Sequence, residues 1–344
     1  MSLPRLALAH TPTPVVRAPA RLLSELGLDA SRIDLWIKRD DVTGGAEAGN
    51  KVRKLEYLLA AAQAEGATVL VTCGGLQSNH ARATAVLGAS LGMRSVLLLR
   101  TTSPDLGPES LPLTGNVLVD RLVGAEIRLI TPHQYRERTE RMAQVAEELR
   151  AAGEHPYVIA EGGSSGLGSF GYVRAMLELG RQLELGLAGG RPFDVVVHAC
   201  GSGGTAAGVA LGAALAGVAS ELRPMAVCDD TAYFEATIAR LVGEARALDP
   251  KLCAPIPVRV DDRAKGPAYG VPTETQKRLI VDVARSSGLL LDPVYTGKAF
   301  YGLVQAARRG ELDGARVLFL HTGGLPGLLA QGAELADAIR GAKR

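Results

Sequence analysis

The sequence lacks an excess of charge of either sign. It contains 38 Lys and Arg residues against 36 Asp and Glu residues, which leaves a formal net charge of +2. A nucleic-acid-binding protein would carry a basic stripe or patch, so we expect no nucleic-acid partner. An acidic disordered tail is equally unexpected, because 47% of the residues are hydrophobic and supply enough apolar surface for a large core.

The sequence also lacks the cysteine spacing of a metal or redox site. Its four cysteines form no CxxC pair, and we expect no metal ion. Cys73 and Cys200 each end an apolar run, where a free cysteine behaves as a small buried hydrophobe. We therefore interpret both as structural.

Neither a signal peptide nor a membrane span is evident. The opening residues MSLPRLALAHTPTPVV place Pro and His where a signal peptide needs an unbroken apolar stretch. The least charged stretch, residues 195–220, is interrupted by His198 and a GSGGT cluster. A buried strand, a turn and a helix explain that stretch better than a span does. We expect a cytoplasmic protein without a membrane partner.

What the sequence does contain is a regular alternation of strand and helix patterns. Short apolar runs alternate with alanine-rich stretches whose apolar residues recur at helical spacing, which indicates an α/β fold with parallel sheets covered on both faces. A length of 344 residues favours roughly two domains. Irregular zones are expected at residues 101–114 and 249–270. The expected strands are residues 69–72, 95–99, 127–130, 157–160, 195–199, 224–228, 289–291 and 317–320.

Three glycine-rich turns follow expected strands, at the edge where open α/β sheets bind ligands. In the first, Gln77, Ser78, Asn79 and His80 open a helix, although one capping residue would suffice. This surplus of polar groups favours a binding site over a simple cap. The third turn is His321-Thr-Gly-Gly. Alone it would be an ordinary helix start, but as the third glycine-rich turn after a strand it supports a binding site at this edge.

The second turn, residues 199–208, reads ACGSGGTAAG. Its glycines let backbone N–H groups converge at a helix N-terminus, where a phosphate is favoured. The turn also half-matches a dinucleotide fingerprint, since Gly201 and Gly203 fit, Ala206 can replace the third glycine and Asp229 closes the next strand. A phosphate site, a nicotinamide site and a tight turn without a ligand all remain open at this point.

Lys51 stands at the first turn of an amphipathic helix, in the run GNKVRK. The positive end of a helix dipole disfavours a cation, and Lys54 adds a like charge one turn later. Both effects favour the neutral amine, which suits a nucleophile or a Schiff base. The alternative interpretation is a solvated residue behind the cap Asn50.

Taken in order, the motifs GNKVRKLE, GGLQSNHARATA, EGGSSGLGSFGY, GSGGTAAG, GPAYGVP, LDPVYTGKA and LHTGG resemble one family. It comprises the pyridoxal-phosphate enzymes 1-aminocyclopropane-1-carboxylate deaminase and D-cysteine desulfhydrase, and the resemblance covers residues 6–329. It implies a tryptophan-synthase-β-like fold with two three-layer, parallel-sheet domains and a homodimer. The large domain would comprise residues 1–53 and 163–344, and a small inserted domain residues 54–162.

The resemblance also implies roles for individual residues. Lys51 would bind pyridoxal 5'-phosphate covalently, Asn79 would bond the ring hydroxyl oxygen, and Ser78 would meet the substrate carboxylate or act on it. Tyr295 would lie beside the ring with Tyr269 as its companion. The remaining expected cofactor contacts are Gly201, Ser202, Gly203, Gly204, Thr205, Thr296 and Thr322, and the remaining expected substrate contacts are Gln77, Asn79 and His80.

Two positions bear on the reaction. Deaminases of this family typically carry Glu directly after the active-site tyrosine and Leu in the last turn, whereas this sequence has Thr296 and Thr322. His80 after Asn79 also looks more like the desulfhydrases. A hydroxyl beside the pyridine nitrogen would make the ring a weak electron sink, which suffices when sulfur is a good leaving group.

The prediction is therefore β-elimination from a small sulfur amino acid, with D-cysteine first. L-cysteate sulfo-lyase and then 1-aminocyclopropane-1-carboxylate deaminase are the alternatives. A nicotinamide-dependent dehydrogenase and a non-catalytic binding protein represent other classes. Glu47 and Asp229 depart from the common family pattern, which leaves substrate choice open.

Overall fold

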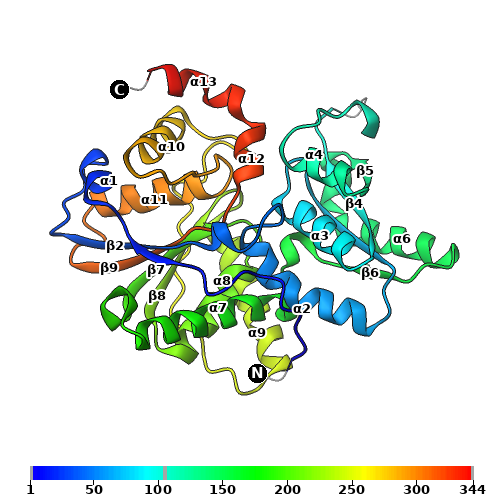
Figure 1. The fold of residues 1–344 in the computed structure, drawn as a ribbon, viewed down its shortest axis with the longest axis horizontal. Helices are drawn as coiled ribbons and strands as arrows, with labels where there is room; N and C mark the ends of the chain where they lie inside the picture. The colour runs from blue at the N-terminus through cyan, green and yellow to red at the C-terminus, as the bar shows by residue number, and fades with distance from the viewer. Residues whose placement is uncertain (1–2, 104–106, 342–344) are drawn as a thin grey trace.

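The computed structural model describes residues 3–103 and 107–341, which form two mostly parallel sheets (Figure 1). In the described residues the larger sheet has five strands, ordered β1 (Val15–Arg17), β2 (Ile33–Lys38), β9 (Ala315–Leu320), β7 (Phe193–Cys200) and β8 (Ala219–Ala226). The smaller has four, ordered β5 (Glu126–Ile130), β4 (Arg94–Arg100), β3 (Val69–Gly75) and β6 (Pro156–Val158). The short edge strand β1 is antiparallel to β2 and is the exception to the expected parallel pairing.

Helices cover both faces of the larger sheet. On one face pack α7 (Gly166–Glu184), α8 (Gly204–Ala216) and α9 (Thr231–Leu248). On the other pack α1 (Ala20–Glu25), α10 (Glu274–Ser287), α11 (Thr296–Arg308) and α13 (Gly332–Gly341). The continuous apolar strands are buried between these two layers, as three-layer packing requires.

The smaller sheet has the same arrangement. Helices α2 (Asn50–Ala64), α3 (Asn79–Ser90) and α4 (Gly115–Leu122) lie on one face, and α6 (Arg138–Ala151) on the other. The remaining helices are α5 (Pro132–Arg136), α12 (Leu325–Ala330) and the 3-10 turns η1 (Asp40–Val42), η2 (Pro108–Ser110), η3 (Glu161–Gly163) and η4 (Leu187–Gly190). No helix in the described ranges is long and apolar enough to cross a membrane.

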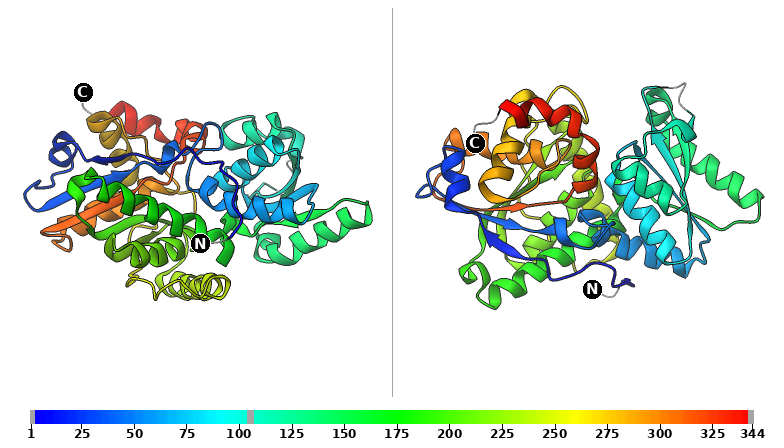
Figure 2. Two further views of the ribbon diagram at one scale, coloured as in Figure 1. Left: turned by 60° about the horizontal axis from the view of Figure 1, so that its bottom comes forward. Right: turned by 45° about the horizontal axis from the view of Figure 1, so that its top comes forward.

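The two sheets lie side by side, and α2 leads from one to the other (right view of Figure 2). The four-stranded sheet uses only residues between 69 and 158, whereas the five-stranded sheet is built from both ends of the chain. The expected domain boundary between residues 53 and 54 falls inside α2, which continues through it as one helix.

Most of the expected strands form, and one prediction is wrong. Residues 289–291 are not a strand, because this apolar segment, in which Leu290 is exposed, leads directly into the turn at Asp292 and pairs with no sheet. The expected set also omitted β1 and β2. The zone 249–270 is irregular apart from isolated bridges, and residues 104–106 of the expected loop at 101–114 lie outside the described residues.

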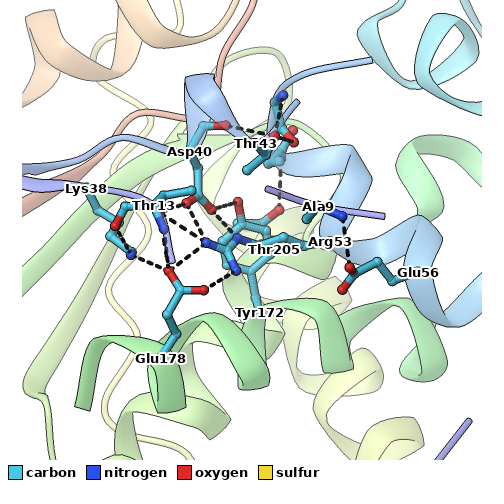
Figure 3. A network of polar contacts seen from close by, with 12 residues as sticks. Ala9, Thr13, Lys38, Asp40, Thr43, Arg53, Glu56, Tyr172, Glu178 and Thr205 are labelled. Atoms are coloured by element: carbon cyan, nitrogen blue, oxygen red, sulfur yellow. Dashed lines mark hydrogen bonds and ion pairs between the residues drawn. The ribbon is translucent and has the colours of Figure 1, made fainter. Parts of the chain in front are cut away.

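A buried ionic network fixes the start of α2 against the larger sheet (Figure 3). Arg53 of α2 donates from Nε to Asp40 Oδ2 at 2.7 Å and from Nη1 to Glu178 Oε2 at 2.9 Å. Lys38 of β2 reaches Glu178 at 2.5 Å, and the Tyr172 hydroxyl donates to Asp40 at 2.7 Å. Burial alone would raise the pKa of Asp40, but Arg53 and Lys38 hold it below its ordinary value. The network therefore stabilises the helix turn that carries the candidate lysine.

Candidate active site

A cavity of about 660 Å³ lies where the carboxyl ends of β3, β7 and β9 meet the beginnings of α2, α3 and α8. It is lined by residues from both sheet units, so the site needs both. Eleven of the expected site residues line it: Lys51, Ser78, Asn79, His80, Gly201, Ser202, Gly203, Thr205, Tyr269, Tyr295 and Thr322. Three do not: Gln77, Gly204 and Thr296.

Lys51 is the second residue of α2 and faces the cavity. The helix begins at a close approach of two backbones, since Asn50 N–H donates to the Thr322 carbonyl at 3.0 Å and a Cβ on Gly49 would lie 3.0 Å from the same oxygen. Gly49 has a φ of +122°, which favours glycine. The sequence thus places the lysine directly beside the last strand-end turn.

The Lys51 amine is available for chemistry. Burial lowers its pKa to about 8, although Glu161 and Cys200 act in the opposite direction. Within the described part of the chain, no side chain or carbonyl forms a hydrogen bond with its Nζ. Gly162 makes room for it, because a Cβ there would lie 3.5 Å from Nζ and would collide with Ser202 Oγ. A substantial fraction of this amine is neutral near pH 8, as a nucleophile or base requires.

The loop 201–205 leads from β7 into α8 and gives that helix its cavity-facing N-terminus. Gly203 turns the chain at a φ of +80°. Ser202 and Ser164 share a hydrogen bond of 2.8 Å, and Asn50 Nδ2 donates to Thr205 Oγ1 at 3.1 Å. The buried Lys54 amine stands behind the loop, where it donates to Ser164 Oγ at 3.2 Å. Free N–H groups, a helix dipole and a nearby amine make this end of the cavity suited to a phosphate.

Gly204 does not line the cavity wall. Its N–H donates to Ser164 Oγ at 3.2 Å, and a Cβ on this residue would lie 3.0 Å from Lys54 Nζ. It is needed for close packing behind the loop, which is a different role from the direct contact that we expected.

The loop after β3 supplies a second helix N-terminus. Ser78 caps α3, with Oγ accepting from Ala81 N–H at 3.2 Å, and it is packed so closely against Gly74 that a side chain there would collide with Oγ. His80 is buried and bonds Thr72 Oγ1 through Nε2 at 2.9 Å. Ser78 therefore both caps α3 and lines the cavity.

Gln77 does not line the cavity, and its expected substrate contact stays a prediction. Its Oε1 accepts from Asn116 N–H at 2.8 Å and its Nε2 donates to the Thr114 carbonyl at 3.2 Å. The side chain instead ties the loop after β3 to the beginning of α4.

Asn116 determines how the amide of Asn79 is turned. Its amide nitrogen lies 3.0 Å from the Gln77 carbonyl oxygen, which can only accept, and 3.1 Å from Asn79 Oδ1. Since the NH₂ group of Asn116 faces both atoms, the Asn79 oxygen is engaged as an acceptor. The Nδ2 group of Asn79 therefore remains available to donate to a ligand in the cavity.

Two tyrosines close another side of the cavity. The hydroxyls of Tyr269 and Tyr295 lie 2.5 Å apart, and the rings meet edge to face. A Cβ on Gly75 would lie 3.3 Å from the Tyr269 ring, and one on Gly201 would lie 3.1 Å from the Tyr295 ring. Burial raises the pKa of Tyr269 to about 12, so its hydroxyl stays protonated at neutral pH.

The two threonines expected beside the cofactor have different positions. Thr322 lies in the turn between β9 and α12 and lines the cavity. Thr296 is fully buried, and its hydroxyl donates to Asp292 Oδ1 at 2.6 Å and accepts from Asp292 N–H at 2.8 Å. Thr296 therefore does not line the cavity, because the first turn of α11 closes on Asp292 instead, and its expected cofactor contact stays a prediction.

Sequence reasoning missed a group contributed by the smaller unit. Glu161 accepts from the Tyr135 hydroxyl and forms an ion pair with Arg138 Nε at 2.7 Å. Arg100 lies at the same wall. The EGGSSG motif contains Glu161, but the spacing of Tyr135 and the two arginines carries no signal, because only the fold of the smaller sheet brings them together.

The two departures from the family pattern also differ in position. Asp229 is exposed at the cavity rim, so it can influence the polarity of the site. Glu47 does not line the cavity, and its carboxylate accepts from Gly45 N–H at 3.1 Å. In the described ranges, no group of three or more His, Cys, Asp or Glu side chains could hold a metal ion.

Replacing Ser78 by alanine should lower catalytic efficiency about 10- to 1000-fold, the effect of removing one positioned polar group. Cofactor binding should persist, and stability should fall by about 1 kcal/mol through the lost cap. Ser165 is a matched control, since its Oγ caps α7 by accepting from Gly168 N–H at 3.1 Å outside the cavity. Steady-state kinetics of both variants separate the roles. If Ser78→Ala had the same catalytic efficiency as the Ser165 variant, Ser78 would act only as a capping residue.

Comparisons with known proteins agree with one another. Residues 6–323 match the protein family described as "Pyridoxal-phosphate dependent enzyme". The mitochondrial bifunctional D-cysteine desulfhydrase/1-aminocyclopropane-1-carboxylate deaminase of Arabidopsis thaliana is 41% identical over 342 residues, which cover 97% of this chain and 81% of that protein. The D-cysteine desulfhydrase of Klebsiella pneumoniae is 38% identical, with 95% and 96% covered. A solved structure described as an ACC deaminase homologue is 38% identical, has a TM-score of 0.85, and 98% of this chain and 97% of that one are covered.

Proposed function

The chain belongs to the pyridoxal-phosphate-dependent enzymes, in the group of 1-aminocyclopropane-1-carboxylate deaminase and D-cysteine desulfhydrase, and from that premise we propose that it converts D-cysteine to pyruvate, sulfide and ammonia. It is thus a pyridoxal-phosphate-dependent lyase acting on a small amino acid. A phosphate of pyridoxal phosphate accounts for the glycine-rich loop, so a nicotinamide cofactor is not needed to explain it.

The cavity residues fit pyridoxal phosphate. Lys51 has an unengaged amine for the aldehyde, and the loop 201–205 has a helix N-terminus for the phosphate. Asn79, Tyr295 and Thr322 would hold the ring between them. When bound, the cofactor supplies an electron-withdrawing ring that stabilises negative charge at the substrate α-carbon.

The protein's own groups then account for proton movement and orientation. Lys51 Nζ, whose pKa burial lowers to about 8, can accept the α-proton near that pH. Asn79 Nδ2 and Ser78 offer donors to a carboxylate at the beginning of α3. The Tyr269 and Tyr295 hydroxyls keep their protons, so they can donate to a departing group.

The observation that carries the choice of reaction is the uncharged wall around Thr322. The carboxylates among the lining residues belong to Glu161 and Asp229, which lie on other segments than Thr322. The Asp292 side chain packs against Gly324, but its oxygens already accept from the backbone N–H groups of residues 294–296 and from Thr296 Oγ1. A hydroxyl partner does not keep a pyridine nitrogen protonated as a carboxylate does. The resulting weak sink supports loss of a sulfur leaving group more readily than opening of a cyclopropane ring.

A substrate panel tests this function. The holoenzyme is assayed with D-cysteine, L-cysteine, L-cysteate and 1-aminocyclopropane-1-carboxylate, and pyruvate, 2-oxobutyrate, sulfide and sulfite are measured separately. We expect D-cysteine to give pyruvate and sulfide in equal amounts, with the highest kcat/KM. If sulfite from L-cysteate were the main product, the function would be that of an L-cysteate sulfo-lyase. If 2-oxobutyrate were the main product, it would be that of a 1-aminocyclopropane-1-carboxylate deaminase.

Three further expectations of the sequence remain predictions. They are the domain boundaries at 53/54 and 162/163, the homodimer and the cytoplasmic location. Light scattering during size-exclusion chromatography tests the homodimer, since it would report about twice the chain mass of 35.9 kDa.

A further inference from the structure

Arg100 is the last residue of β4 and lines the cavity beside the proposed substrate position. In the sheet it pairs with Gly75 of β3, from which the loop continues to Ser78 and Asn79. Its guanidinium carbon lies 4.8 Å from the centre of the Tyr135 ring and 5.2 Å from that of the Tyr269 ring. Since the N–H donors of a guanidinium lie in its plane, aromatic rings on its faces hold it in place without using those donors.

The charge of Arg100 is not compensated within the described part of the chain. No hydrogen bond or ion pair to its guanidinium is present there, although the side chain is partly buried. Glu161, the carboxylate on the same wall, is already engaged by Tyr135 and Arg138. A partly buried guanidinium with free donors at a cavity wall is suited to an anionic ligand group.

Two anionic groups of the bound reactants already have other partners. The cofactor phosphate would occupy the loop 201–205 with Lys54 behind it, and the substrate α-carboxylate would meet Ser78 and Asn79 at the beginning of α3. The group that remains is the substituent on the substrate β-carbon.

We propose that Arg100 is a specificity-determining residue that binds an anionic substituent on the β-carbon of the substrate, a thiolate or a sulfonate. This inference rests on the proposed β-elimination and names the class of substrate for it. It predicts that the enzyme discriminates by the charge of the side chain in addition to its size.

Binding of aspartate and asparagine tests the proposal directly, because the two have nearly the same shape and differ in side-chain charge. Each enantiomer is titrated into the holoenzyme, and binding is followed by the change in cofactor absorbance. We expect aspartate to bind about 10- to 100-fold more tightly than asparagine in the wild type, the effect of a charge-assisted hydrogen bond. The preference should vanish in Arg100→Gln and persist in part in Arg100→Lys. Equal affinities of the two ligands for the wild type would overturn the proposal, whether or not the variants fold.

Turnover provides the second arm. Arg100→Gln should lower kcat/KM for cysteine and cysteate about 10- to 100-fold but change that for 3-chloroalanine, whose β-substituent is neutral, less than about threefold. Arg94→Gln removes the same charge at the opposite, exposed end of β4 and should leave all three values unchanged. An equal loss for all three substrates would assign Arg100 to the α-carboxylate and overturn the proposal. If no substrate yields pyruvate with the wild type, the proposed β-elimination itself fails, irrespective of Arg100.

Discussion

Replacing Lys51 by alanine should abolish turnover, with a loss of at least about 10⁴-fold, while the fold is retained. The variant removes both the amine that would bind the cofactor aldehyde and the base that would accept the α-proton, and base catalysis alone is worth about 10²- to 10⁴-fold. The purified variant should also lack the absorbance of covalently bound cofactor. Absorbance spectra, circular dichroism and product assays together check these expectations.

The control is Lys251→Ala, which removes an exposed lysine that does not line the cavity. It should retain both the colour and the rate of the wild type. A Lys51→Ala protein with normal colour and rate would contradict the assignment of the cavity as the cofactor site.

The second large effect is expected from the buried network behind the lysine. Asp40→Ala leaves the Arg53 guanidinium and the Lys38 amine with Glu178 as their remaining carboxylate. Removing one partner from a buried ionic cluster costs about 3–5 kcal/mol of stability. Because Arg53 stands two residues beyond Lys51, we also expect weaker cofactor retention. The midpoint of urea denaturation and the cofactor content of the purified variant measure both effects.

Asp41→Ala is the matched control for this prediction. Asp41 pairs with Arg39 at a partly exposed position, where an ion pair contributes about 1 kcal/mol or less. Similar urea midpoints for the Asp40 and Asp41 variants would show that the buried network does not stabilise the beginning of α2.

The sequence predicted the parts of the site that depend on short, local patterns. Glycine-rich turns after apolar strands marked the edges of the sheets where Ser78, Gly201 and Thr322 face one cavity. Lys51 was recognisable because a cation at a helix N-terminus is unusual. In each case the chemistry and the local geometry reside in fewer than ten consecutive residues.

The sequence could not predict features that depend on long-range packing. Thr296 follows the active-site tyrosine directly, yet its hydroxyl closes a turn with Asp292, and only the three-dimensional path of the chain decides between these roles. Arg100 and Glu161 come from different segments of the smaller unit. Their position at the cavity depends on strand pairing and on how the two units meet.

The most direct test of the central claim is a competition between two substrates. The holoenzyme is given equal concentrations of D-cysteine and 1-aminocyclopropane-1-carboxylate, and pyruvate and 2-oxobutyrate are quantified early in the reaction, so that their ratio equals the ratio of the two kcat/KM values. With an uncharged wall around Thr322, we expect pyruvate to predominate by at least about tenfold, accompanied by an equal amount of sulfide. Predominance of 2-oxobutyrate would contradict the account and assign ring opening to this enzyme.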